Sequence, residues 1–297
     1  MLTPRYWKPA LLCFGLMGTI NFCSQQAAPP EFVSRQYKSY PVPAQMTFAG
    51  EPVPLDIPDV AERLDRELQS NAYFHSNTIL ALKRVTRFLP EIEASLREQG
   101  LPDDFKYVAL AESLLGNVVS PAGAAGVWQL MPETSRGYGI IVNSEIDERY
   151  HLAKATVAAA AYFKKAKDKF GTWTNAAASY NRGMNGLQRA FDDQHVTSYY
   201  DLYLNPETSR YMFRVLALKE VLEHPARYGF DVNNIKGYSP TQSRSITVEE
   251  SIPDLPQFAL DNGTNYKTLR LYNPWIKDYK LTITSSRPSY QLQLPVN

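Results

Sequence analysis

The feature that most constrains this chain is a helical pattern of apolar residues that continues from about residue 60 to about residue 230 without a credible strand. Apolar side chains recur at third or fourth positions, as Val60, Leu64 and Leu68 do, and this spacing places them on one face of a helix. A segment of this length is able to bury a core of its own. We therefore predict a mainly α-helical domain over residues 56–236.

Proline, glycine and charged residues divide this pattern into separate helices. Pro90 is expected to open a helix that Gly100 closes, and residues 101–104 (LPDD) are typical of the next helix start. Residues 152–169 are rich in Ala and Lys and predict a long helix. Residues 181–183 (NRG) are expected to interrupt the helical segment that follows it.

The pattern changes after a boundary that we expect at residues 237–243. Residues 244–297 carry short strand-like segments at both ends and helical segments between them, and they form a unit that is small for an independent core. The expected elements are a strand at 245–248, helices at 255–262 and 266–272, and a strand at 290–294. This order predicts a β-α-α-β module.

The N-terminal residues 1–23 have the composition of an export signal. Arg5 and Lys8 precede a short apolar run at residues 9–20. A run of this length suits a secretory signal peptide and is short for a membrane-spanning helix. We therefore expect an exported protein in the periplasm or associated with the outer membrane.

The only two cysteines, Cys13 and Cys23, both lie in this region. Cleavage at or beyond Cys23 would leave a mature chain without a disulfide, stable by packing alone. Cys23 is a candidate for the lipid-anchored first residue of a lipoprotein, although Phe22 is bulkier than usual before such a cysteine. The alternative is a plain signal peptide. Residues 24–55 are rich in proline and predict an extended linker.

Charge and composition restrict the possible partners. A formal net charge of +1 gives no general reason to expect nucleic acid or a strongly acidic partner, and we expect no nucleic-acid binding. Aromatic residues make up 12% of the chain, with 19 Tyr. This excess fits a tyrosine-rich core and surface, and it also fits a groove that stacks on sugar rings. Only the positions of the aromatic residues can separate the two.

The most informative stretch is residues 101–139, because it places a single carboxylate, Glu112, near the end of a predicted helix. Val108, Ala109, Ala111 and Leu115 surround Glu112 at one-turn spacings. Desolvation by such neighbours raises the pKa of a carboxyl group, as a general acid near neutral pH requires. The alternative is a structural glutamate that pairs with a nearby Arg or Lys.

No other carboxylate is an evident partner for Glu112. A two-carboxylate glycosidase holds its acids roughly 5 to 9 Å apart, whereas Asp104 lies two helical turns back, roughly 12 Å along the axis, and Asp103 lies farther. Spacing does not exclude Glu133, Asp147 or Glu148, but Glu133 is expected in the first turn of a short helix that begins at Pro132. Residues 147–149 (DER) are interpreted as a structural charge cluster.

Signals for metal, cofactor or covalent chemistry are missing from the sequence. The histidines show no metal-ligand spacing, no cysteine follows residue 23, and no glycine-rich phosphate loop follows a strand. We therefore expect neither a cofactor nor a metal. The four histidines are interpreted as surface or packing residues: His75, His151, His195 and His224.

Four motifs in the helical segment occur in a recognisable order. They are Glu112-Ser113, residues 120–132 (SPAGAAGVWQLMP), Tyr138-Gly139 and residues 178–183 (ASYNRG). In this order they resemble the motifs of the lytic transglycosylase family, which has a goose-lysozyme-like fold. The resemblance covers about residues 56–230 and implies a lysozyme-like helical catalytic domain.

The resemblance implies that Glu112 is the sole catalytic acid and that the partner is a peptidoglycan glycan strand. Glu112 would protonate the oxygen between N-acetylmuramic acid and N-acetylglucosamine and then act as a base. In that second step it would take the proton of the muramyl C6 hydroxyl, which closes a 1,6-anhydro ring. The sequence identifies no protein partner.

The resemblance also implies a set of substrate-binding residues. Ser120, Gln129 and Asn181 would bind N-acetyl and hydroxyl groups of the sugars. Met131 would pack against the glycan, and Tyr180 would place its hydroxyl near the acid or the substrate.

Some neighbouring residues have a structural interpretation, and some positions depart from the family. Ser113 is expected to support the helix, and Trp128 is expected in the core. The interval from Glu112 to Ser120 is one residue shorter than in many members of the family, and residues 182–184 (RGM) replace a more usual Ala-Gly pair.

Residues 244–297 resemble a LysM glycan-binding module, with residues 252–254 (IPD) in place of the usual Gly-Asp-Thr turn. Glycan binding and simple packing on the catalytic domain are both open for this module. For the whole chain, the alternatives to a lytic transglycosylase are a lysozyme-like hydrolase on the same fold and a catalytically silent protein that binds peptidoglycan.

Overall fold

The computed structural model describes residues 38–296. The predicted signal peptide, Cys23 and the first part of the predicted linker lie outside the described residues. Every element named below belongs to one compact unit of the chain, residues 39–297.

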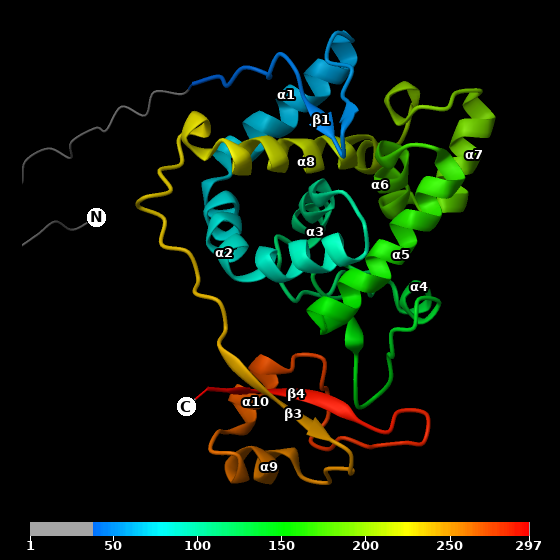
Figure 1. Cartoon of the computed structure of the whole chain (residues 1–297). Coiled ribbons are helices and arrows are strands. Elements are labelled where there is room, and N and C mark those ends of the chain that lie inside the picture. The colour runs from blue at the N-terminus through cyan, green and yellow to red at the C-terminus, as the bar shows by residue number, and fades with distance from the viewer. Residues whose placement is uncertain (1–37, 297) are drawn as a thin grey trace, which may run out of the picture. The chain divides into compact units, whose positions relative to one another are not determined.

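The helical part contains eight α-helices among the described residues (Figure 1). They are α1 (Pro58–Tyr73), α2 (His75–Glu98), α3 (Lys106–Ser113), α4 (Pro132–Arg136), α5 (Leu152–Phe170), α6 (Trp173–Arg182), α7 (Met184–Gln194) and α8 (Pro206–Glu223). The predicted mainly helical domain is confirmed. Within the described part of the chain, no helix is both long and apolar enough to cross a bilayer.

Helix α3 lies among the other helices, close to α2 and α8 (Figure 1). It begins after a single 3-10 turn, Asp103–Phe105, and it is only 8 residues long. An isolated helix of that length is not stable in water, so its neighbours must hold it in place. The side chains of Tyr107, Val108, Ala109 and Leu110 are buried and make this contact.

The predicted helix start at Pro90 is wrong, because Pro90 lies inside α2. Proline removes one helical hydrogen bond, here to the carbonyl of Thr86 four residues earlier. Both residues are exposed, so water can replace that bond. Apolar side chains are buried on both sides of the proline, among them Leu82 and Ile92, and this packing keeps the helix continuous.

Part of the predicted linker over residues 24–55 belongs to the folded domain. Strands β1 (Thr47–Phe48) and β2 (Glu51–Pro52) pair as an antiparallel hairpin. Phe48 is fully buried, with its ring 5.4 Å from that of Phe105 between centroids. Glu51 accepts hydrogen bonds from the amides of Trp173 (2.7 Å) and Thr174 (2.9 Å) and so caps α6. The proline-rich composition predicted an extended linker, whereas residues 47–52 form a hairpin that packs on the helical domain.

The C-terminal module has the predicted β-α-α-β order. Strands β3 (Ser243–Val248) and β4 (Tyr290–Pro295) are antiparallel, and α9 (Leu255–Asp261) and α10 (Tyr266–Tyr272) lie between them in sequence. The module has its own cluster of buried apolar side chains. Ile146, from the segment between α4 and α5, contributes to that cluster.

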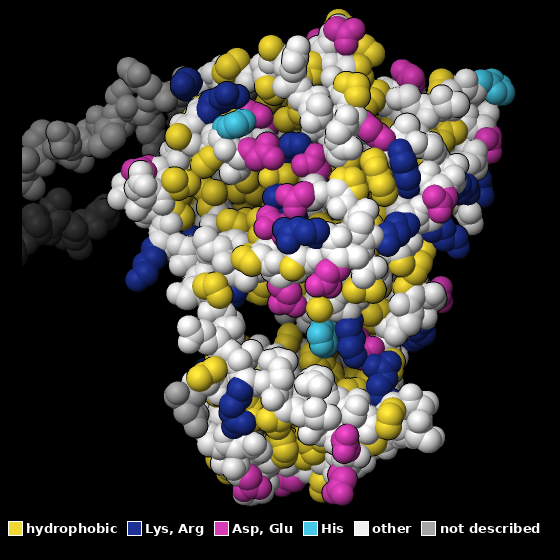
Figure 2. Space-filling view, viewed as in Figure 1, with side chains coloured by type: hydrophobic (Ala, Val, Ile, Leu, Met, Phe, Trp, Pro, Cys, Tyr) yellow, Lys and Arg dark blue, Asp and Glu magenta, His cyan; other side chains and the backbone are white. Residues whose placement is uncertain are grey.

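The surface of the described residues carries both signs of charge. Figure 2 shows Lys and Arg side chains intermingled with Asp and Glu side chains over the face in view. This distribution agrees with the formal net charge of +1.

We expect Phe48→Ala to lower the free energy of unfolding by about 3–5 kcal/mol, because it empties a fully buried aromatic site. Thr47→Ala in the same strand is the control, since Thr47 is exposed, and its effect should stay within about 0.5 kcal/mol. Urea denaturation followed by circular dichroism measures both. Equal effects of the two substitutions would show that the hairpin is not part of the domain.

Candidate active site

Glu112 lies in the last turn of α3, where the chain reverses direction. Leu114 and Leu115 both adopt left-handed backbone angles, with φ of 49° and 59°. Such angles are uncommon outside glycine and end a helix sharply. The guanidinium of Arg84 donates a hydrogen bond to the carbonyl of Leu114 (3.0 Å) and holds this turn against α2.

Ser113 supports the end of α3, as expected. Its hydroxyl donates to the carbonyl of Val127 at 2.7 Å and lies 3.3 Å from the carbonyl of Ala109. Val127 belongs to the loop of residues 118–131, which we call the site loop. The bond therefore fixes the helix that carries Glu112 to the site loop.

The surroundings of Glu112 raise its pKa, as a general acid near neutral pH requires. Burial raises the pKa of Glu112 from its ordinary value of 4.5 to about 7. The hydroxyl of Tyr211 donates to Glu112 Oε1 at 2.6 Å, which lowers this pKa, and the positive charge of Arg214 lowers it as well. The negative charge of Glu207 raises it. The predicted effect of apolar surroundings is confirmed, and burial outweighs the groups that favour ionisation.

Sequence reasoning missed these three neighbours on α8. Glu207, Tyr211 and Arg214 are spaced by four and three residues, so they lie on one face of the helix. Tyr211 is buried, and its ring centroid lies 5.9 Å from the guanidinium carbon of Arg214. The spacing is visible in the sequence, but nothing local links α8 to Glu112, about a hundred residues earlier.

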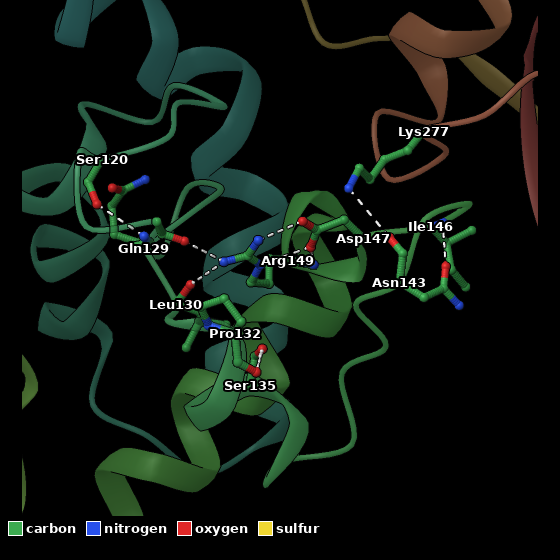
Figure 3. A network of polar contacts seen from close by, with 12 residues as sticks. Ser120, Gln129, Leu130, Pro132, Ser135, Asn143, Ile146, Asp147, Arg149 and Lys277 are labelled. Atoms are coloured by element: carbon green, nitrogen blue, oxygen red, sulfur yellow. Dashed lines mark hydrogen bonds and ion pairs between the residues drawn. The ribbon is translucent and has the colours of Figure 1, made fainter.

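Ser120 and Gln129 stabilise the site loop. The Ser120 hydroxyl accepts from the amide of Ala124 (3.0 Å). The side-chain amide of Gln129 donates to the carbonyls of Val118 (2.9 Å) and Gly126 (2.8 Å). Figure 3 shows both side chains within one network of polar contacts. Ser120 keeps its own proton and Gln129 keeps its carbonyl oxygen for other partners.

Tyr180 connects the site loop to α6. Its hydroxyl donates to the carbonyl of Trp128 at 2.8 Å. Burial raises its pKa well above the ordinary value, and the charge of Glu112 adds to this, so the two residues are neighbours. Trp128 is fully buried and bonds Thr156 (2.8 Å), as expected of a core residue.

The remaining predicted binding residues lie beside these elements. Met131 is the last residue of the site loop and has 42% of its surface exposed, which is high for a large apolar side chain. Asn181 follows Tyr180 on α6 and is half-buried. Hydrogen bonds thus join α3, through Ser113, and α6, through Tyr180, to the site loop. Met131 ends that loop, and Asn181 is the residue after Tyr180.

The other carboxylates considered in the sequence have structural roles. Asp103 pairs with Lys106. Asp104 accepts from Lys219 and from the amide of Ala49, both at 2.7 Å, and so joins α8 to the hairpin. Glu133 lies in the first turn of α4, as predicted.

Metal chemistry has no candidate site in the described part of the chain, where no group of three or more His, Cys, Asp or Glu residues is placed to hold an ion. His151 stacks on Trp275, with ring centroids 6.1 Å apart. Burial lowers its pKa to about 4, so it is neutral at physiological pH. This agrees with its interpretation as a packing residue.

A desolvated carboxyl group at the end of a short central helix, bonded by the buried Tyr211, is the arrangement expected of a lysozyme-like domain. Residues 90–202 match the family model of the transglycosylase SLT domain. Residues 244–297 match that of the soluble lytic transglycosylase C-terminal LysM-like domain. The chain therefore combines an SLT transglycosylase domain with a LysM-like module, and the resemblance found in the sequence is confirmed.

Two curated relatives are each named membrane-bound lytic murein transglycosylase D. They come from Escherichia coli strain K12 and from Escherichia coli O6:H1 strain CFT073. Each is 26% identical to this chain over 254 residues, which is 82% of the chain and 54% of the relative. The chain thus spans about half the length of the curated relatives it matches.

We expect Glu112→Gln to stabilise the protein in a pH-dependent way. The folded-state pKa of Glu112 is about 7 and the ordinary value is 4.5, so the wild type loses stability as the pH rises through this window. Glutamine does not ionise, and the variant should therefore gain about 1–3 kcal/mol over the wild type at pH 8 relative to pH 4.5. Urea denaturation at the two pH values measures the difference. The same difference at both pH values would contradict a raised pKa.

Proposed function

We propose that this protein is a lytic transglycosylase that acts on the glycan strands of peptidoglycan. It cleaves the β-1,4 bond between N-acetylmuramic acid and N-acetylglucosamine and leaves 1,6-anhydromuramyl ends. The observation that carries the proposal is the desolvated carboxyl group of Glu112, which accepts a hydrogen bond from Tyr211 at 2.6 Å and has a pKa raised to about 7. A group with this pKa can give a proton in one step and accept one in the next at neutral pH. The SLT domain and the name of the relatives support the same substrate.

In the first step, protonated Glu112 gives its proton to the bridging oxygen. The bond between that oxygen and C1 of the muramyl residue breaks, and the N-acetylglucosamine leaves with a free hydroxyl group. Positive charge develops at C1 as the bond breaks. The carboxylate that forms on Glu112 is stabilised by the hydrogen bond from Tyr211 (2.6 Å).

In the second step, ionised Glu112 takes the proton of the muramyl C6 hydroxyl. The C6 oxygen attacks C1 and forms the 1,6-anhydro ring, and Glu112 returns to its protonated state. No water is consumed. A second carboxylate is not required, because the nucleophile belongs to the substrate.

Five residues are proposed to bind the glycan. Ser120 offers a hydroxyl proton and Gln129 offers a side-chain carbonyl, since their other polar groups are already bonded within the site loop. Asn181 would bind N-acetyl or hydroxyl groups, and Met131 provides exposed apolar surface for a sugar ring. Tyr180 already donates to Trp128, so it is proposed to act as an acceptor.

Hydrolysis on the same fold is the second candidate. A hydrolase needs a base that activates water. Glu207 is exposed on α8 and its charge acts on Glu112, so it is the described carboxylate best suited to that role. A catalytically silent peptidoglycan-binding protein is the third candidate, and it would not require the raised pKa of Glu112.

We infer that the protein acts in the bacterial cell envelope, where peptidoglycan lies. The relatives are named as membrane-bound. The signal peptide and the lipidation of Cys23 stay predictions, since both lie outside the described residues. Glycan binding by the C-terminal module also stays a prediction. An open cavity of about 640 Å³ lies beside the atypical residues 252–254 of that module.

Mass spectrometry of the products of digested sacculi tests the proposed function. We expect muropeptides lighter by one water than hydrolytic products, because the anhydro ring forms in place of a reducing end. Glu112→Gln should lower their release by about 10³-fold or more, since the proton donor is lost. Reducing muramyl ends would instead identify a hydrolase. Unchanged release by Glu112→Gln would show that Glu112 is not the acid.

Tyr211→Phe should shift the pH dependence of the reaction. The hydroxyl of Tyr211 lowers the pKa of Glu112, so its removal raises that pKa above about 7. The acid then stays protonated to higher pH, and the alkaline limb of kcat should move up by about one pH unit. Tyr107→Phe is a matched control, because Tyr107 lies on α3 and donates to a different carboxylate, Glu223, at 3.0 Å. A downward shift in Tyr211→Phe, or equal shifts in both variants, would contradict this role.

A further inference from the structure

A buried ion pair, Asp147 with Arg149, lies outside the proposed chemistry. The two residues are only 2% and 7% exposed. Arg149 donates through Nε to Asp147 Oδ1 (2.9 Å) and through Nη2 to Oδ2 (2.7 Å). Two parallel bonds fix the plane of the guanidinium group. Burial of both charges is costly unless the remaining donors of Arg149 are also satisfied.

Those donors hold the site loop. Arg149 Nη1 donates to the carbonyls of Gly123 (2.7 Å) and Leu130 (3.0 Å), which lie on either side of the turn that contains Gly126 (Figure 3). A Cβ atom at Gly126 would lie 2.0 Å from the carbonyl oxygen of Arg149. The site loop therefore packs directly on both the side chain and the backbone of Arg149.

The segment that carries Asp147 and Arg149 also contacts the C-terminal module. We call residues 143–151 the docking segment. The amide of Asp147 donates to the carbonyl of Trp275 (2.7 Å), and the amide of Lys277 donates to the carbonyl of Glu145 (2.7 Å). Between them, the side chain of Ile146 lies in the apolar cluster of the module. The docking segment thus pairs with the module through its backbone and is anchored by a buried side chain.

Two carboxylates of the docking segment add polar contacts to the module. Glu148 is buried and accepts from Arg287 at 2.8 Å. Glu145 accepts from the amide and the hydroxyl of Thr282, both at 3.0 Å, and from Lys280 at 3.1 Å. These contacts come from the segment between α10 and β4. The backbone contacts of Trp275 and Lys277 come from this segment as well, so the module binds the docking segment through the residues between α10 and β4.

The chain that leads into the module is also held. The amide of Tyr238 donates to the carbonyl of Lys83 on α2 (2.8 Å), and the hydroxyl of Thr86 donates to the carbonyl of Tyr238 (2.8 Å). Arg87 donates to the carbonyl of Ser239 (2.9 Å). The connection between the two folded parts is thus bound to α2 over these residues.

We propose that the C-terminal module is a structural part of the active site. The module binds the docking segment and so holds Asp147 in place. Asp147 orients Arg149, and Arg149 in turn fixes the site loop, which carries Ser120 and Gln129. Asp147 and Arg149 are positioning residues, because they act through the loop and do not take part in proton transfer. The expected effect on substrate binding rests on the proposed function, whereas the coupling between the docking segment and the site loop does not.

The test uses the full chain and changes only the module. Replacement of Arg149 would leave Asp147 buried without its partner and risks unfolding. The double variant Arg287→Gln, Thr282→Val removes side-chain donors to Glu148 and Glu145 and leaves the docking segment and the site loop unaltered in sequence. The matched control is Arg244→Gln with Thr268→Val, since Arg244 bonds the module's own Asn262 carbonyl (3.4 Å) and Thr268 lies in α10.

Hydrogen exchange followed by mass spectrometry is the first measurement. In the double variant, amides of the docking segment and of the site loop should exchange about 10-fold faster than in the wild type, because local opening of one releases the other. The control should exchange like the wild type in both segments. Amides of α1, which lies in neither segment, should be unaffected in both variants.

Kinetics with a soluble glycan oligosaccharide provide the second measurement. We expect the KM of the double variant to rise about 5-fold, because the site loop carries binding residues. The alkaline pKa of kcat should stay unchanged, since the groups on α3 and α8 around Glu112 are not altered. A general loss of stability would not raise the KM while leaving the alkaline pKa of kcat unchanged.

Faster exchange in the docking segment with an unchanged site loop and unchanged KM would overturn the proposal. Unchanged amide exchange in the docking segment of the double variant would overturn it too, since the binding of that segment by the module would then not depend on these contacts. Failure of the proposed function is a different result. It would appear as missing anhydro products in the wild type, and it would leave the coupled hydrogen exchange intact.

Discussion

The burial of the Glu112 carboxyl group, with one hydrogen bond from Tyr211, is the interaction on which the rest of the site depends. Desolvation alone favours the protonated acid, and the bond from Tyr211 favours the carboxylate. The balance between them leaves the pKa at about 7. A fully apolar pocket would hold the proton too tightly to release it, and an exposed carboxyl group would not hold it at neutral pH. The fold around Glu112 keeps this balance between desolvation and the hydrogen bond from Tyr211.

Helix α3, helix α8 and the site loop hold the residues of the candidate site in place. Helix α3 is too short to be stable alone, so its place is set by α2 and α8, and α8 also supplies Tyr211, Arg214 and Glu207. The site loop is tied to α3 through Ser113 and to α6 through Tyr180. Each of these bonds uses a backbone carbonyl of the loop, which leaves side chains such as Ser120 available for a substrate.

Much of this structure could be predicted from local signals. Helical periodicity and caps predicted the mainly helical domain, its long helix near residues 152–169, the break at residues 181–183 and the β-α-α-β order of the module. The apolar neighbours of Glu112 indicated its raised pKa, and the charged residues 147–149 were correctly interpreted as structural. These features depend on residues within one or two helical turns of each other, so the sequence pattern contains the necessary information.

The errors and omissions concern contacts between distant segments. Pro90 continues a helix because α2 is packed on both sides of it, and Phe48 is buried by residues that follow the hairpin by more than fifty positions. Tyr211 meets Glu112 across 99 residues of sequence. Only tertiary packing determines such contacts, and neither proline content nor periodicity carries a signal for them.

We propose that Glu112 works without a water-activating carboxylate, although the charge of Glu207 acts on it. Digestion of peptidoglycan in water labelled with heavy oxygen tests it most directly, with mass spectrometry of the newly formed muramyl ends. We expect these ends to carry no heavy oxygen, because the nucleophile is the C6 hydroxyl of the substrate. One heavy oxygen atom per new end would show that water attacks C1 and would rule out this mechanism.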